Sequence, residues 1–465
     1  TEWLADFQTL YDYVENNYPY LAVKNRTHGY NWLDLKPMYE TRIQEATSND
    51  DFLLILHDAI KALQNRHTGI IDPNDYSEYA NMLGDSFYPL TEMFSEEAAN
   101  ASDYWRTILY SSGSSYRQKM NRRFVASIVY DRGEYIIANP GSWNFYGDDL
   151  TVVAVNGTPI DNLVPTCFEK DYIDWDYQRN KSYLWMVSPR DFGENAIFTI
   201  RNTTGYEVDM TFNAYNGYSG FPYDHYPYQT YNSEFYEEEN VAYLYISTFE
   251  WNIISNHLAF FSDFMQRIEG YDYLILDIRG NTGGNYQSWI EAIVEPLIDE
   301  TTTLEAYLAY RTSEYSDVFR TEFGLTTEIS KEIFEYLPPE VYTDDFKVYQ
   351  YYHPFSPVNP VDFDGEIILL TDHIVYSAAE AFTLFCKQTG FATIYGTTSG
   401  GDGLMAFPTL FQLPYSKLII NFCSALGLDR TGHANEEWRT QPDVLYESEF
   451  GNWEELIEYT LTNLP

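Results

Sequence analysis

Residues 273–284 have the sequence YLILDIRGNTGG, in which a continuous apolar strand runs directly into a turn rich in Gly and Asn. A strand that is apolar on both faces is typical of the buried parallel sheet of an α/β protein, and such proteins build their sites where strands end. Glycines at positions 280, 283 and 284 allow positive φ angles and leave backbone N–H groups uncovered for an oxyanion. A tight strand-to-helix turn that serves no site has the same composition, so this stretch by itself indicates the fold and not a functional site.

Strands and helices alternate on both sides of this stretch. The strand VAYLYI (241–246) precedes it, and the strand EIILLT (366–371) follows it. The apolar spacing between and after these strands predicts helices near 253–269 and 286–298 and a further helix that begins at Ala378. This order predicts an α/β layer with parallel strand pairing.

The patterns divide the chain into three parts. These are a helical N-terminal domain that contains His67, a small β-rich module and an α/β core, over residues 1–120, 121–215 and 216–465. In the first part, apolar residues recur at helical spacing over 53–63, downstream of candidate N-cap residues at 48–50. In the third part, residues 300–358 are charged and rich in Tyr, and we interpret them as an insertion over one face of the core that is able to shape or gate a cleft.

The β-rich module is predicted from short runs such as VASIVY, YIIA and LTVVAVNG. Asn156-Gly157 is a strong hairpin signal, because both residues tolerate the positive φ angles of a tight turn. The following stretch, Tyr215 to Tyr236, is crowded with Tyr, Gly, Pro and Asn and has no sustained period. We interpret it as a connecting loop and not as a repeat.

The composition excludes several classes of partner and site. Seventy acidic residues against 27 basic ones give a formal charge of -43, which repels nucleic acid and anionic lipid surfaces. No apolar run approaches the roughly 18 residues that a membrane span needs, so we expect a soluble protein. Cys167, Cys386 and Cys423 are too few and too scattered for a disulfide framework or a thiolate metal site. The first residue is Thr1, which suggests a removed leader and an extracytoplasmic location: periplasmic, cell-surface or secreted.

Ser377 follows a buried strand in EIILLTDHIVYSAAEAF (366–382) and stands at the start of the predicted helix. Two interpretations are open. As an N-cap it would bond a free N–H of the first helical turn, which is the usual role of Ser at a helix start. As a nucleophile it would be exposed at the helix N-terminus, where the macrodipole and the N–H of Ala378 favour a developing negative charge.

A serine nucleophile needs a base, and the chain has eight histidines. His67, in LQNRHTGIID, lies where an amphipathic helix gives way to an extended run, so it projects from the end of an element. That position suits a catalytic base, because histidine exchanges protons near neutral pH. His373 lies four residues before Ser377 and is the second candidate.

Three segments, in this order, resemble the carboxyl-terminal processing, or tail-specific, protease family. They are YLILDIRGNTGG, TDHIVYSAAEAF (371–382) and GTTSGGDG (396–403). The segment GDDLTVVAVNGTPI (147–160) is similar to the PDZ-like domain of the family, without a clear carboxylate-binding loop. The resemblance implies a crotonase/Clp-protease-like ββα spiral catalytic core beside the helical domain and the PDZ-like module. It also implies oxyanion donors at Ala378 and at Gly283 or Gly284, and no metal or cofactor.

This sequence departs from the serine-lysine branch of the family at the position of the catalytic base. The serine-lysine branch takes its base from a Gly-Lys-Gly motif, and this position is Asp402, which is a far weaker base than a desolvated lysine. We therefore expect Asp402 to be dispensable. The branch similar to the tricorn core uses a histidine, and RHT at 66–68 resembles its motif except at Arg66. That branch orients its histidine with a glutamate, for which Glu436 has the matching offset and Glu437 is its neighbour.

The sequence thus predicts a serine peptidase that hydrolyses peptide bonds through an acyl-enzyme, with a polypeptide as its partner. Ser377 is the expected nucleophile, His67 the base and Glu436 the residue that holds the imidazolium. The alternative is an inactive relative that binds peptides or apolar ligands, since fold does not settle function. A glycosidase with paired acids has little support, because no motif places a pair among the 70 carboxylates.

Overall fold

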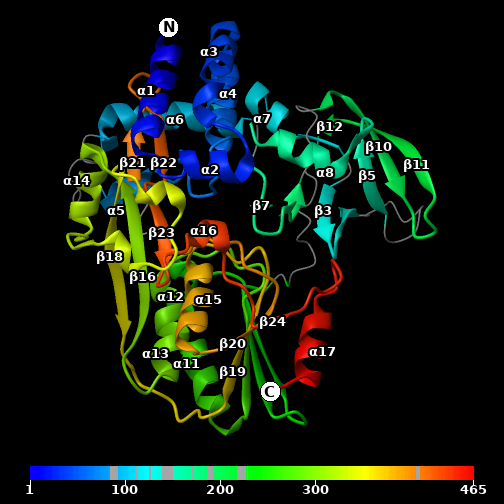
Figure 1. Cartoon of the computed structure of the whole chain (residues 1–465), viewed down its shortest axis with the longest axis vertical. Helices are drawn as coiled ribbons and strands as arrows, with labels where there is room; N and C mark the ends of the chain where they lie inside the picture. The colour runs from blue at the N-terminus through cyan, green and yellow to red at the C-terminus, as the bar shows by residue number, and fades with distance from the viewer. Residues whose placement is uncertain are drawn as a thin grey trace.

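The protein is described by a computed structural model (Figure 1). The described residues are 1–83, 93–111, 113–124, 127–138, 150–169, 172–185, 192–216, 227, 229–404 and 409–465. Part of the predicted PDZ-like segment, residues 147–149, and half of the predicted connecting loop, residues 217–226 and 228, lie outside them. Among the helices that are described, none has the length and apolar character needed to cross a bilayer.

A six-stranded sheet forms the centre of the core, in the order β13-β14-β15-β19-β20-β24. Its strands are β13 (Tyr231–Tyr236), β14 (Val241–Ile246), β15 (Tyr273–Asp277), β19 (Glu366–Thr371), β20 (Thr393–Gly396) and β24 (Val444–Leu445). Strands β14 to β24 pair in parallel, which confirms the predicted parallel layer. The antiparallel edge strand β13 corrects the prediction of a loop up to Tyr236, because its backbone pairs with β14 over six residues.

Helices cover both faces of this sheet (Figure 1). On one face lie α10 (Trp251–Ile254), η4 (Ser255–His257), α11 (Leu258–Arg267), η5 (Ile268–Gly270), α12 (Tyr286–Trp289), the π-turn η6 (Ile290–Val294), α13 (Glu295–Leu297) and α15 (Ala378–Thr389). On the other face, α17 (Glu454–Thr462) buries Leu456 and Ile457. The helices predicted near 253–269, near 286–298 and from Ala378 are confirmed.

A second sheet, in the order β17-β18-β16-β23, stands beside the first. It consists of β16 (Thr302–Arg311), β17 (Glu328–Ile329), β18 (Phe346–Phe355) and β23 (Ala425–Asp429), and its connections contain α14 (Glu314–Glu322), η7 (Lys331–Ile333) and η8 (Pro339–Tyr342). Residues 300–358 are therefore not an insertion laid over the core, because β16 pairs with β23 and buries Leu304 and Ala306 in the core itself.

The N-terminal helices pack on a third sheet, β1-β22-β21, and in the described part of the chain they share one apolar cluster with it. The elements are α1 (Glu2–Asn17), α2 (Leu21–His28), η1 (Trp32–Leu35), α3 (Lys36–Glu45), α4 (Asn49–Lys61), α5 (Tyr76–Leu83), α6 (Glu96–Tyr110), α7 (Ser115–Met120), β1 (Gly69–Ile70), β21 (Thr409–Gln412) and β22 (Ile419–Phe422). The Ser48 side chain accepts from the N–H of Asp51, which confirms the predicted cap of α4. The pairing of β1 with β22 carries the chain next to His67 into the core.

The β-rich module is an antiparallel sheet in the order β11-β10-β5-β4-β3-β9, on the right of Figure 1, with its own apolar cluster. Its elements are β3 (Ser127–Asp131), β4 (Glu134–Ala138), β5 (Thr151–Val155), β6 (Thr158–Pro159), α8 (Ile160–Leu163), η3 (Val164–Cys167), β9 (Leu184–Trp185), β10 (Asn195–Arg201) and β11 (Glu207–Asn213). The predicted Asn156-Gly157 hairpin is confirmed, with φ angles of 48° and 77° between β5 and β6. Two further strand pairs are short and antiparallel. They are β2 (Arg122–Arg123) with β12 (Tyr215–Asn216), and β7 (Trp175–Asp176) with β8 (Lys181–Ser182).

Candidate active site

Ser377 is held in a strained backbone conformation at the start of α15. Its φ and ψ angles are 57° and -125°, and its side chain makes no capping hydrogen bond to the helix. A residue other than glycine in this region costs of order 1–3 kcal/mol, and such strain concentrates at functional sites. The interpretation of Ser377 as a simple N-cap is therefore wrong, because the hydroxyl points away from the first turn toward His67.

His67 lies directly against this hydroxyl. Its Nε2 atom is 3.0 Å from Ser377 Oγ. The chain turns sharply after α4, where Gln64 has a φ angle of 55° and the Asn65 side chain accepts the backbone N–H of His67. The imidazole packs on the Tyr376 ring, with 4.8 Å between centroids. Arg66, the residue that departs from the family motif, lies over the same tyrosine ring at 4.4 Å.

Asp402 occupies the other side of the imidazole. Its Oδ2 atom is 2.8 Å from His67 Nδ1, and the same oxygen accepts from Asn65 Nδ2 at 2.8 Å and from the Tyr376 hydroxyl at 2.9 Å. Its second oxygen, Oδ1, accepts from the Tyr20 hydroxyl at 3.1 Å. Both carboxylate oxygens are thus satisfied by donors, although only 2% of the residue is exposed.

These contacts keep Asp402 ionised. Burial by itself raises the pKa of the Asp402 carboxyl, but the charge of His67 and the hydrogen bonds from His67, Asn65 and Tyr376 lower this pKa below its ordinary value. A carboxylate that accepts from Nδ1 fixes the tautomer in which Nε2 carries a lone pair. Nε2 is then able to accept the Ser377 proton.

The glycine turn after β15 packs against the serine. A Cβ atom on Gly283 would lie 2.8 Å from the Ala378 nitrogen and 2.8 Å from Ser377 Cβ, so only glycine fits there. The N–H of Gly283 donates to the Asn281 side chain at 2.9 Å and is not free for an oxyanion. Of the predicted donors, this leaves the N–H groups of Ala378, at the start of α15, and of Gly284.

The predicted contact between Glu436 and His67 is wrong. Glu436, on α16 (Asn435–Trp438), forms an ion pair with Lys24 of α2, and Glu437 pairs with Arg26 at 2.8 Å. Burial raises the pKa of Glu436, against the opposing charge of Lys24. The position under the imidazole is filled by Asp402, because its turn has a left-handed backbone with a φ angle of 54°.

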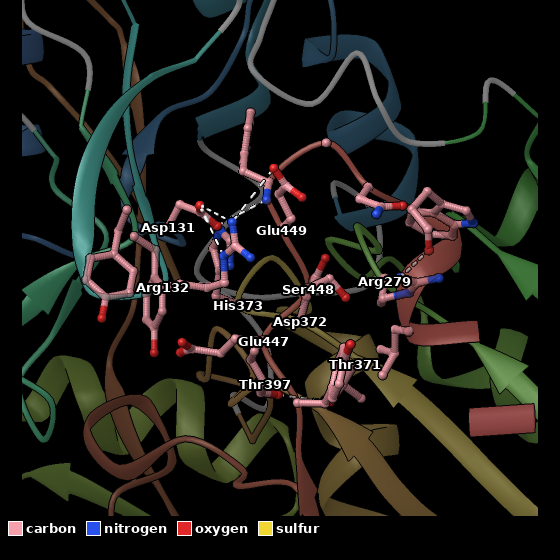
Figure 2. Close-up of a pocket in the computed structure, with 18 residues that line it drawn as sticks. Asp131, Arg132, Arg279, Thr371, Asp372, His373, Thr397, Glu447, Ser448 and Glu449 are labelled. Carbon is pink, nitrogen blue, oxygen red and sulfur yellow. Dashed lines mark hydrogen bonds and ion pairs between the residues drawn. The ribbon is translucent and has the colours of Figure 1, made fainter. Parts of the chain in front are cut away.

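His373, the second candidate base, lies in another pocket. Figure 2 shows it on the wall of a cavity of about 110 Å³, together with Arg132 and Glu449. Its ring stacks on Tyr183 at 4.6 Å, and burial lowers its pKa. Ser377, His67 and Asp402 are not among the residues that line this pocket, so the structure does not bring His373 to the serine hydroxyl.

Sequence reasoning missed the carboxylate and its supporting donors. The signal for Asp402 was present, since two glycines flank it in GGDG, but its chemistry argued against the role of a base. Tyr20, Asn65 and Tyr376 carried no signal, because only the folded chain brings them to one carboxylate. Among the residues that the structure describes, no group of three or more His, Cys, Asp or Glu side chains is arranged to hold a metal ion.

A known family model matches the part of the chain that contains Ser377 and Asp402. Residues 240–446 match the family model described as Peptidase family S41. Ser377, Asp402 and the glycine turn lie inside the S41 region, whereas His67 comes from the helices that precede it. The side chain of His67, from outside the matched region, therefore contacts Ser377 inside it.

The fold of the whole chain is similar to that of mature CPAF. The structure of mature CPAF complexed with lactacystin has a TM-score of 0.59 and 14% identity, and the match covers 99% of this chain and 97% of that chain. Mature CPAF by itself gives 0.58 and 13%, over 99% and 95%. At these identities the likeness shows the fold alone. No curated protein matches the chain by sequence.

Proposed function

We propose that this S41 protein is a serine peptidase in which Ser377 is the nucleophile, His67 the general base and Asp402 the residue that orients the imidazole. The observation that carries the proposal is the continuous line of hydrogen bonds from Asp402 Oδ2 through both ring nitrogens of His67 to Ser377 Oγ. Nucleophile, base and orienting group within hydrogen-bond reach are the geometric signature of acyl transfer.

In the first half of the reaction, Ser377 Oγ attacks the carbonyl carbon of the scissile peptide bond. The hydroxyl proton moves to His67 Nε2, and Asp402 stabilises the imidazolium that forms. The N–H groups of Ala378 and Gly284 bind the oxyanion of the tetrahedral intermediate. The C–N bond then breaks, and His67 returns the proton to the leaving amine.

In the second half, the acyl group on Ser377 is hydrolysed. A water molecule gives a proton to His67 Nε2 and attacks the ester carbon through the same oxyanion site. The Ser377 Oγ–C bond breaks, the proton returns to Oγ, and a new carboxyl terminus leaves.

The position of Asp402 supports the histidine-using branch of the family over the serine-lysine branch. Where the lysine branch has its base, this chain has a buried carboxylate on the far nitrogen of His67. The carboxylate does not need to be a base there, since it only has to hold and stabilise the imidazole.

A fluorophosphonate probe tests the proposal. It should label the wild-type protein on Ser377, and Ser377→Ala and His67→Ala should abolish labelling and hydrolysis of fluorescein-labelled casein. His373→Ala serves as the matched control and should retain both. A folded wild-type protein that neither labels nor hydrolyses casein would show an inactive relative that binds peptides or apolar ligands.

A further inference from the structure

Glu380 is a buried carboxyl that the proposed reaction does not use. It lies in the first turn of α15, three residues after Ser377, and is 0% exposed. Glutamate is almost never fully buried unless it is paired. No ion pair among the described residues includes Glu380, so its burial calls for another explanation.

Glu380 connects the nucleophile helix to the segment that follows β23. Its Oε1 atom accepts from Asn435 Nδ2 at 2.6 Å and from Thr440 Oγ1 at 2.7 Å. Asn435 extends the connection, because its Oδ1 atom accepts the backbone N–H of Gly403 at 2.7 Å. Gly403 directly follows Asp402, so the Asn435 side chain links Glu380 to the turn that contains Asp402.

The same turn packs directly on Glu380. A Cβ atom on Gly403 would lie 2.7 Å from Glu380 Cγ and 2.5 Å from the Ala381 nitrogen. On the other flank of Asp402, a Cβ atom on Gly401 would lie 3.0 Å from the carbonyl oxygen of Asn435. Asp402 is therefore fixed from both sides by contacts that Glu380 and Asn435 organise.

The charge of Glu380 would act on the proposed oxyanion site. Burial raises the pKa of Glu380 to about 7, against hydrogen bonds from Ser399, Asn435 and Thr440. Tyr286 is coupled to Glu380, since the pKa of Tyr286 is raised by burial and by the charges of Tyr351, Asp402 and Glu380. The segment that binds Glu380 through Asn435 and Thr440 also carries the charged residues Glu436, Glu437 and Arg439. An ionised Glu380 would add a negative charge to the helical turn that has to receive the oxyanion.

We propose that Glu380 is a positioning residue, which holds the Gly401–Gly403 turn and with it Asp402 against the nucleophile helix, and which supports the reaction as the neutral acid. The inference rests on the proposed function of Ser377, His67 and Asp402. It assigns a role to a group that touches none of the reacting atoms.

The test measures the rate of fluorophosphonate labelling of the full chain between about pH 6 and 9. Asn435→Ala breaks the connection to Gly403 and should lower the rate about tenfold or more throughout this range. Glu380→Gln cannot ionise, so its ratio of rates at about pH 8.5 to about pH 6.5 should exceed the wild-type ratio about threefold or more. Glu366→Gln removes an exposed carboxylate on β19 and is the control for charge alone.

Two results would overturn the inference. One is an Asn435→Ala rate within about twofold of the wild type, and the other is a Glu380→Gln pH profile that coincides with the wild-type profile. If Glu380→Gln fails to fold, Asn435→Ala decides alone. A wild-type protein that does not label refutes the proposed function itself, which separates that failure from a failure of this inference.

Discussion

His67 Nδ1 lies 2.8 Å from Asp402 Oδ2, although 335 positions separate the two residues in the chain. The contact joins the end of α4 to the glycine-flanked turn that contains Asp402. Asp402 is buried and accepts four hydrogen bonds in total. The imidazole therefore has one orientation, with Nε2 directed at Ser377.

Asp402→Asn should lower kcat about 10³- to 10⁴-fold, because an amide at this position favours the wrong imidazole tautomer. Steady-state hydrolysis of labelled casein measures the effect. Glu436→Gln is the matched control, and its kcat should stay within about threefold of the wild type although its Tm falls, since Lys24 loses its partner. A nearly active Asp402→Asn together with an inactive Glu436→Gln would restore the role expected from sequence.

Gly283→Ala should abolish labelling and destabilise the fold. The new Cβ atom would meet the Tyr376 carbonyl oxygen at 2.7 Å and the Ala378 nitrogen at 2.8 Å, so Ser377 has to move. Gly133→Ala is the matched control, because Gly133 has a φ angle of 100° against 107° for Gly283 and an added Cβ atom would meet nothing within 4 Å. This variant should lose only the roughly 1–3 kcal/mol of backbone strain. Full activity in a folded Gly283→Ala protein would remove this close packing from the mechanism.

Tyr376→Phe should lower kcat about tenfold with little change in KM, because it removes one of the hydrogen bonds that orient Asp402 and keeps the ring under His67. Tyr243→Phe is matched to it, since that buried hydroxyl also donates to a carboxylate, Asp277, at 2.9 Å. Urea unfolding should show similar losses of stability in both variants. Equal losses of kcat in both would argue for a general effect on the fold.

Glu380→Gln should change the pH dependence of stability. The pKa of Glu380 rises from 4.5 in the unfolded chain to about 7 in the fold, so the unfolded state loses its proton first as the pH rises. Below about pH 4.5 the carboxyl is protonated in both states and does not lower the free energy of unfolding of the wild type. Between about pH 4.5 and pH 7 this free energy falls by on the order of 3 kcal/mol. Relative to wild type, the variant should therefore gain stability over this range in urea unfolding, whereas Glu366→Gln should not. Parallel curves for Glu380→Gln and wild type would contradict this.

Local patterns were sufficient for the elements of the core. The apolar runs at 241–246, 273–278 and 366–371 specify buried parallel strands, because each is apolar on both faces. Ser48 specifies the start of α4 through its capping bond, and Asn156-Gly157 specifies a hairpin through its φ angles. Each of these depends on neighbours within a few residues, which a sequence displays directly.

Only the tertiary structure decided which carboxylate serves His67. Glu436 and Asp402 are both acidic residues at motif positions, and their local sequences do not show that α2 takes one of them through Lys24. It also decided that β16 and β18 belong to a core sheet, because strand partners distant in sequence are chosen by the packing of the whole chain. The residue types and motif order came from the sequence, whereas the contacts among Ser377, His67 and Asp402 exist because three separate segments meet at one point.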